Sequence, residues 1–101
     1  MLFNIGIEPA TNENEAYGII VPVFNKLGYG CNSAADNEKE IIDQVTDAIL
    51  LVAKEMMLDG LDLELLNEGA TDYSQTYSDF THWLIVDVNV GELKEKPSAL
   101  I

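Results

Sequence analysis

The sequence predicts a single α+β domain in which a small sheet carries one long helix on one face. Three segments predict this: alternating apolar residues over 2–8, an amphipathic stretch over 38–59, and a second alternating stretch over 83–90. A period of two indicates a strand, and apolar spacing of three and four indicates a helix. The predicted order is β-β-β-α-β, and the expected sheet is mixed, with three or four strands, because a strand–helix–strand connection allows a parallel last strand.

The first half of the chain predicts the three early strands. Residues 2–8 form the first, with Phe3, Ile5 and Ile7 on one face. The polar segment 9–15 has turn composition, and residues 17–21 form a second strand that pairs with the first as a hairpin. Proline lacks an N–H, so Pro22 ends the regular pairing. Residues 25–29 then form a loop. A short third strand is expected over 30–35.

The long helix is predicted over residues 38–59. Asn37 is expected to cap it, with Glu40 reaching back to the N–H of the cap residue. Gly60 is placed to adopt the left-handed conformation that ends a helix. One helical face is wholly apolar and is made by Ile41, Val45, Ala48, Ile49, Val52 and Met56.

The region between the long helix and the last strand has no long periodic pattern. Tyr73, Tyr77 and Phe80 fit one side of a short helix, although the intervening Ser and Thr residues disfavour it. One long helix covers only one face of a sheet, so the other face is expected to be bare and to be a candidate for self-association or partner binding. We therefore expect a homo-oligomer, a dimer or a tetramer. Trp83 is expected to cover the core at a strand end rather than to anchor an interface.

The charge excludes several classes of partner. Eighteen acidic residues face five lysines and no arginine, for a net charge of −13. Nucleic acid and anionic membrane surfaces repel such a chain, whereas a basic protein is attracted to it. The N-terminus lacks the basic region and long apolar core of a signal peptide, and no apolar run reaches the ~20 residues that span a bilayer. These features predict a cytoplasmic protein that binds no membrane and no nucleic acid.

Catalytic chemistry has little support in the residues. Cys31 is the only cysteine, which excludes an internal disulfide, and His82 is the only histidine. A two-metal nuclease needs converging carboxylates, and those available are Glu8, Asp43, Asp47 and Asp87. Solvated surface charge is the simpler interpretation of these acids and of others such as Glu64 and Glu68. The sequence thus predicts no enzyme, no metal and no cofactor.

Several segments, taken in order, resemble the HicB family of type II antitoxins over residues 1–90. They are Glu8-Pro9, Tyr-Gly-Ile-Ile-Val-Pro at 17–22, Gly-Cys-Asn-Ser-Ala-Ala at 30–35, the acidic helix, and Trp-Leu-Ile-Val-Asp-Val at 83–88. The positions that match the family pattern are Tyr17, Gly18, Pro22, Gly30, Cys31, Ser33, Trp83 and Asp87. We interpret these residues mainly as fold-forming, with Gly18 and Gly30 permitting close approach of the backbone.

The resemblance implies a partial RNase H-like fold without catalytic activity. It also implies a HicA-like toxin partner, a small basic mRNA interferase that the antitoxin neutralises by covering its active site and RNA-binding surface. Family members usually add a C-terminal segment that binds operator DNA and autoregulates transcription. Residues 91–101 are expected to be a linker at the start of such a segment. From composition, the candidate toxin contacts are Glu13, Glu15, Asp72, Tyr73, Tyr77 and Asp79.

Two alternatives to the antitoxin remain open at this point. One is a metal-dependent nuclease that uses the RNase H-like fold catalytically. The other is a self-associating module whose bare sheet face makes an oligomer.

Overall fold

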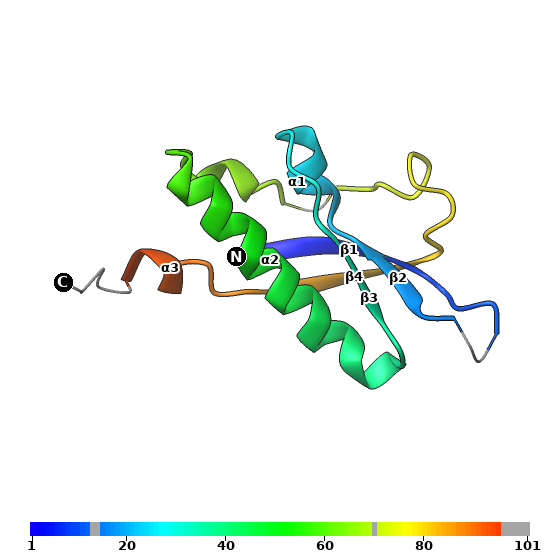
Figure 1. The fold of residues 1–101 in the computed structure, drawn as a ribbon. Coiled ribbons are helices and arrows are strands. Elements are labelled where there is room, and N and C mark those ends of the chain that lie inside the picture. Colours follow the sequence, from blue (N-terminus) through cyan, green and yellow to red (C-terminus); the bar gives the residue numbers. More distant parts are fainter. Residues whose placement is uncertain (13–14, 70, 96–101) are drawn as a thin grey trace.

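The computed structural model describes residues 1–12, 15–69 and 71–95, and Figure 1 shows its arrangement as one sheet with a long helix across it. The predicted α+β class and the single long helix are confirmed. The elements are β1 Leu2–Glu8, β2 Tyr17–Ile20, α1 Pro22–Lys26, β3 Asn32–Ala35, the 3-10 turn η1 Glu38–Glu40, α2 Ile41–Leu58, the 3-10 turn η2 Leu63–Leu66, β4 His82–Asp87 and α3 Glu92–Glu95.

The sheet has four strands in the order β3-β2-β1-β4, and every pair is antiparallel. The expectation of a mixed sheet is therefore wrong. If α2 alone connected β3 to β4, the two strands would run parallel. Here the chain also runs back along the sheet after α2, over residues 67–69 and 71–81. It passes Asn4 near the middle of β1 and reaches His82, which lies opposite Ile7 near the far end of β1. The chain has thus reversed once more before β4 begins.

Helix α2 packs on the face of the sheet that carries Phe3, Ile5 and Ile7, and all three are buried. The buried residues of α2 are Ile41, Val45, Ile49, Ala53 and Met56, which confirms most of the predicted helical face. The start of the helix differs from the prediction. Residues 38–40 form a 3-10 turn, and Asn37 makes no side-chain capping hydrogen bond. At the other end Gly60 adopts a φ of +88°, the left-handed conformation expected there.

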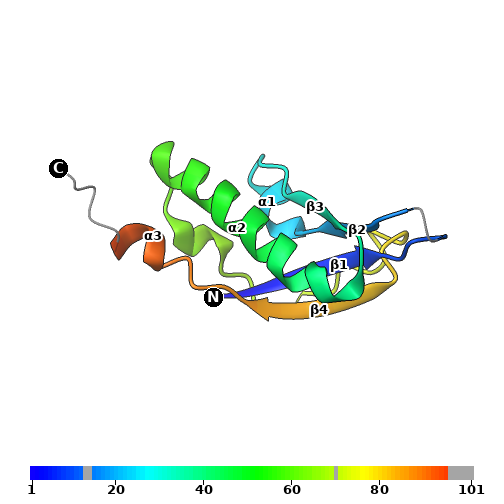
Figure 2. The same ribbon diagram turned by 60° about the horizontal axis from the view of Figure 1, so that its bottom comes forward.

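The opposite face of the sheet is partly covered, which corrects the expectation of a bare face. The chain between η2 and β4 crosses it; we call this part the strap and define it as residues 67–69 and 71–81. In Figures 1 and 2 the strap lies on the side of the sheet away from α2. It contacts β1 through Asn4 and β2 through Phe80, whose ring carbon is 4.0 Å from an ideal Cβ built on Gly18. It contains no helix among the residues described, contrary to one interpretation of its aromatic spacing.

The short helix α1 was not predicted, and its last two residues, 25 and 26, fall in the segment that was expected to be a loop. Pro22 occupies its first turn, where the missing N–H costs no hydrogen bond. The helix brings Phe24 against Phe3 of β1, with the two rings stacked at 5.9 Å. Both rings are fully buried, so α1 completes the core beside the end of β2.

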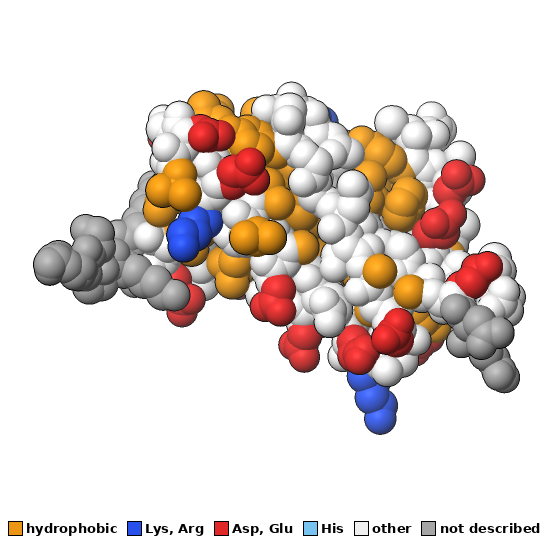
Figure 3. All heavy atoms as spheres, viewed as in Figure 1, with side chains coloured by type: hydrophobic (Ala, Val, Ile, Leu, Met, Phe, Trp, Pro, Cys, Tyr) orange, Lys and Arg blue, Asp and Glu red, His pale blue; other side chains and the backbone are white. Residues whose placement is uncertain are grey.

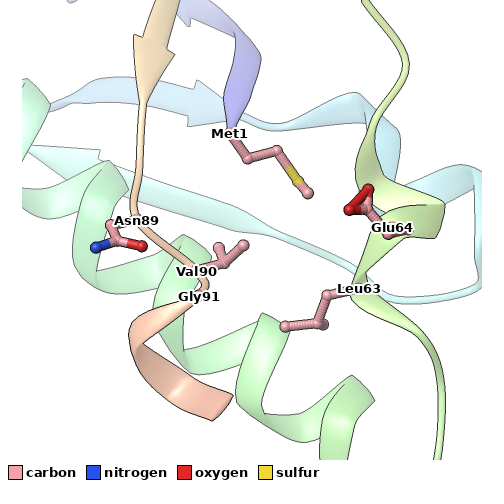
Figure 4. Close-up of a pocket in the computed structure, with 6 residues that line it drawn as sticks. All are labelled: Met1, Leu63, Glu64, Asn89, Val90 and Gly91. Atoms are coloured by element: carbon pink, nitrogen blue, oxygen red, sulfur yellow. The ribbon is translucent and has the colours of Figure 1, made fainter. Parts of the chain in front are cut away.

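The last strand is shorter than predicted, because β4 ends at Asp87, but Val88 and Val90 remain buried. Figure 4 shows Val90, Met1 and Leu63 around one open hollow of about 210 Å³ at this end of the molecule. The expected linker over 91–101 contains the helix α3, and residues 96–101 lie outside the part that the structure describes.

Candidate partner-binding face

Aromatic side chains fix the strap to the sheet. Tyr73 stacks on Trp83 of β4 with ring centroids 6.1 Å apart, and Tyr77 meets Tyr73 and Phe80 edge to face at 6.1 and 6.4 Å. Trp83 lies against Gly6 of β1, where an added Cβ would be 2.7 Å from the indole ring. Trp83 therefore packs within its own domain, as expected. Its buried Nε1 has no hydrogen-bond partner among the residues described.

Glu68 is the polar centre of the strap. Its carboxylate accepts hydrogen bonds from Asn4 Nδ2, at 3.1 Å, and from the Tyr73 hydroxyl. Lys26 Nζ lies 3.6 Å from it and 4.8 Å from the centre of the Tyr73 ring. Burial and the hydrogen bond to Glu68 raise the pKa of Tyr73. The side chain of Glu68 is only 10% exposed, so the interpretation of this residue as solvated charge is wrong.

Three of the predicted contact acids are exposed. Asp72 accepts hydrogen bonds from the Ser74 hydroxyl and backbone N–H at 2.6 and 2.9 Å, which lower its pKa. Glu15 accepts from the hydroxyl and the N–H of Thr11, and these bonds lower its pKa as well. Asp79 is exposed in the last turns of the strap. All three acids are thus free to meet a basic partner.

The strap runs from the middle of the sheet, where Asp72 lines a hollow with Asn4 and Ile85, to the end of the molecule at which the β1–β2 hairpin lies, as Figures 1 and 2 both show. Tyr77 is half-buried there, and its hydroxyl accepts a hydrogen bond of 3.2 Å from Asn25 Nδ2. Tyr73 is only 6% exposed and holds the strap in place, so we do not include it in a contact surface. Glu13 lies outside the described residues. The candidate surface, which we call the acidic face, consists of Glu15, Asp72, Tyr77 and Asp79.

Acidic side chains are not confined to the acidic face. In Figure 3 they are also distributed along α2, with few basic side chains between them. On α2 the exposed acids include Asp47 and Glu55. The charge that would attract a basic partner is therefore broad, and the acidic face differs from α2 in combining charge with an aromatic side chain.

The family-pattern residues are mostly structural in this fold. Cys31 is 1% exposed, its carbonyl accepts the Val21 N–H at 3.0 Å, and burial raises the pKa of its thiol to about 12. Ser33 Oγ lies 3.5 Å from the carbonyl of Gln44 on α2. Tyr17 is half-buried, with its hydroxyl 3.5 Å from Glu38. A thiol so buried and so weakly acidic is a poor nucleophile.

The two pattern glycines differ. An ideal Cβ on Gly18 would lie 3.2 Å from Glu8 Oε1, so the close approach expected there is present. At Gly30 the nearest atom is 4.0 Å away, and the expectation of a close approach is wrong. The tightest site is Gly6, which sequence reasoning missed. The sequence does contain a signal for it. A glycine inside a predicted strand has no side chain to pack and often marks a place where another residue approaches the backbone closely.

The carboxylates considered for a nuclease do not converge. Glu8 ends β1, while Asp87 pairs with Leu2 at the start of β1 and forms an ion pair of 2.9 Å with the N-terminal ammonium. Six residue steps along β1, from Leu2 to Glu8, separate the two acids, about 20 Å at the usual rise. Asp43 and Asp47 are exposed on α2. Over residues 1–12, 15–69 and 71–95 no group of three His, Cys, Asp or Glu side chains is arranged to hold a metal ion.

A family model described as "HicB_like antitoxin of bacterial toxin-antitoxin system" matches residues 3–100. The chain belongs to the HicB-like antitoxin family. The predicted resemblance is thereby confirmed, and it extends beyond the 90 residues on which it was based. No curated protein matches the chain. Over the described residues this HicB-like chain contains no helix long and apolar enough to cross a membrane.

Solved structures agree with this fold. The chain is similar to the crystal structure of the Burkholderia pseudomallei antitoxin HicB, with a TM-score of 0.66 and 21% identity, over 96% of this chain and 70% of that one. It is also similar to the N-terminal domain of the same antitoxin, with a TM-score of 0.57 and 19% identity, over 88% of this chain and 99% of that domain. At these identities the likeness concerns the fold alone.

Proposed function

We propose that this HicB-like chain neutralises a small basic ribonuclease of the HicA kind by binding it and covering its RNA-binding surface. Membership of the antitoxin family over residues 3–100 carries the proposal. The net charge of −13 supports it, because a ribonuclease must present cationic side chains to RNA phosphates. The antitoxin would act stoichiometrically in the cytoplasm, without turnover.

The acidic face is the proposed contact surface. Glu15, Asp72 and Asp79 place carboxylates where RNA phosphates would otherwise lie, and Tyr77 adds apolar contact area beside them. The strap that carries three of these residues is fixed by Glu68 and by aromatic stacking, so little ordering entropy is lost on binding.

We do not propose operator binding for residues 1–101. Eighteen acidic residues against five lysines repel DNA phosphates, and the described residues form no basic surface that would offset this. Autoregulation would need a DNA-binding segment of the kind that family members carry.

The experiment compares two charge reversals in a co-expression assay with the basic protein encoded beside the antitoxin. The double variant Asp72→Lys, Asp79→Lys is expected to lose rescue of growth. The matched control Asp47→Lys, Glu55→Lys changes the net charge equally on α2 and is expected to rescue. Rescue by both variants would remove the acidic face from the proposal, and failure of the unmodified chain to rescue would remove the proposal itself.

A further inference from the structure

The hollow that Asp72 lines lies between the strap and the sheet and has a volume of about 400 Å³. Asn4 of β1 and Ile85 of β4 line it from the sheet, and these two residues are opposite each other in the β1–β4 register. Asp72 and Tyr73 line it from the strap. We call it the Asp72 hollow. It is the part of the acidic face that has depth as well as charge.

Asp72 brings an oriented carboxylate to this hollow. Its Oδ1 accepts the Ser74 N–H at 2.9 Å and the Ser74 hydroxyl at 2.6 Å. A carboxylate held in this way by the residue two positions later is fixed relative to the backbone. Its Oδ2 accepts no hydrogen bond from the described residues. One oxygen of an exposed, negatively charged group is therefore available to a donor from another molecule.

Asn4 brings a second available acceptor, and it is only 8% exposed. Its Nδ2 donates to Glu68 Oε2 and to the Gly69 carbonyl, both at 3.1 Å. Both partners are acceptors, which fixes the orientation of the amide. Its Oδ1 accepts no hydrogen bond from the described residues, yet the enclosed side-chain atom without a partner among them is Trp83 Nε1 and not this oxygen. Asn4 Oδ1 is therefore open to solvent beside the hollow.

The rest of the Asp72 hollow is mainly apolar. Ile85 is 60% exposed, and the polar atoms of Trp83 and Tyr73 are either enclosed or already bonded. The Thr71 hydroxyl also lines the hollow and can accept as well as donate. Lys26 does not line it. The side chains of the hollow thus offer one negative charge, two free acceptors and apolar surface, with no cation among them.

We propose that the Asp72 hollow takes one arginine side chain of the basic partner, an inference that rests on the proposed function. The guanidinium donates to the free oxygens of Asp72 and Asn4, and its aliphatic stem lies against Ile85. Arginine fits better than lysine, because its planar group carries five donors and is more weakly hydrated than an ammonium. A neutral side chain would leave the Asp72 charge unpaired, and an acidic one would be repelled.

The first test titrates the purified chain with the blocked tripeptide acetyl-Gly-Arg-Gly-amide and follows NMR signals. Trp83 is the only tryptophan, so its indole N–H gives one signal beside the hollow. This signal and the Asn4 side-chain amide are expected to shift until the site is saturated. The neutral citrulline peptide is expected to cause no such shift, and the lysine peptide is expected to bind more weakly. Absence of a saturable shift with the arginine peptide, or equal binding of either other peptide, would overturn the proposal.

Two variants locate the peptide. Asp72→Asn keeps an oxygen for the Ser74 hydrogen bonds but removes the charge, and it is expected to weaken binding of the arginine peptide about tenfold or more. The matched control Asp47→Asn makes the same charge change on α2 and is expected to bind as the unmodified chain does. Amide signals away from the hollow are expected to stay in place in both variants, which shows that they are folded. Equal binding by the two variants would overturn the proposal.

Calorimetry with the basic protein encoded beside this chain separates failure of the hollow from failure of the proposed function. Asp72→Asn is expected to weaken this complex about tenfold or more. Each arginine of the partner is then changed to lysine in turn. One of these changes is expected to weaken binding to the unmodified chain but to add little loss in Asp72→Asn. Independent losses for every arginine would overturn the hollow and leave the proposed function standing. If the unmodified chain does not bind the partner, the proposed function fails, and the proposed partner of the hollow fails with it.

Discussion

The indole ring of Trp83 lies directly against Gly6, so that a Cβ at Gly6 would stand 2.7 Å from the ring. The two residues are opposite each other in the β1–β4 register. Trp83 in turn stacks on Tyr73 of the strap. Because Gly6 has no side chain, the ring of Trp83 can lie against β1. Trp83 then holds the strap in place through Tyr73, and the strap carries most of the acidic face.

Gly6→Ala is expected to destabilise the fold by about 1–3 kcal/mol, because the added methyl group would overpack a ring that other aromatic rings confine. Chemical denaturation measures the free energy of unfolding. Gly30→Ala is the matched control, since the nearest atom to its Cβ is 4.0 Å away, and it is expected to be near neutral. Equal effects of the two substitutions would contradict the close packing at Gly6.

Glu68→Gln is expected to cost about 1–3 kcal/mol, because it removes the charge that Lys26 and the hydrogen bonds of Asn4 and Tyr73 stabilise. Increased proteolytic cleavage within the strap should accompany the loss. Glu64→Gln, at an exposed position four residues earlier, should change stability by less than about 0.5 kcal/mol. If Glu68→Gln changed stability as little as Glu64→Gln, the contacts of Glu68 would not stabilise the strap.

Tyr29 and Asp59 predict a specific alkaline titration. The Tyr29 hydroxyl donates to Asp59 Oδ2 at 2.6 Å, and this bond raises the pKa of Tyr29 to about 12. Tyrosine in the unfolded chain ionises near pH 10, at about its reference pKa. The stabilising effect of the raised pKa is therefore fully present below pH 10 and is lost as the pH rises through about 12.

NMR titration of the tyrosine rings measures the pKa of Tyr29. Asp59→Asn, directly after the end of α2, is expected to lower the pKa of Tyr29 toward its ordinary value, and Asp47→Asn, within α2, is expected to leave it unchanged. An unaltered Tyr29 pKa in Asp59→Asn would show that the hydrogen bond is absent in solution.

The sequence predicted the elements whose periodicity is local. Phe3, Ile5 and Ile7 identified β1, and the apolar face of α2 and the left-handed Gly60 identified the helix and its end. The direction of β4 could not be predicted, because it depends on the path of the strap, which has no periodic pattern. The roles of Glu68 and Gly6 were missed for a related reason.

Glu68 and Gly6 act through contacts between residues far apart in the chain. Glu68 meets Asn4 across 64 positions, and Gly6 meets Trp83. For the acidic face, composition identified Asp72 and Asp79 as exposed acids. It could not separate Tyr77 from Tyr73, because only tertiary packing decides which tyrosine is buried.

The measurement that tests the central claim most directly is inhibition of RNA cleavage by the basic protein encoded beside this antitoxin. Cleavage is followed while the purified chain is titrated at low salt and again at high salt. We predict complete inhibition near one chain per toxin, with weaker binding at high salt because ions screen the attraction of the acidic face. Cleavage that continues at full rate in a large excess of the chain would contradict the account.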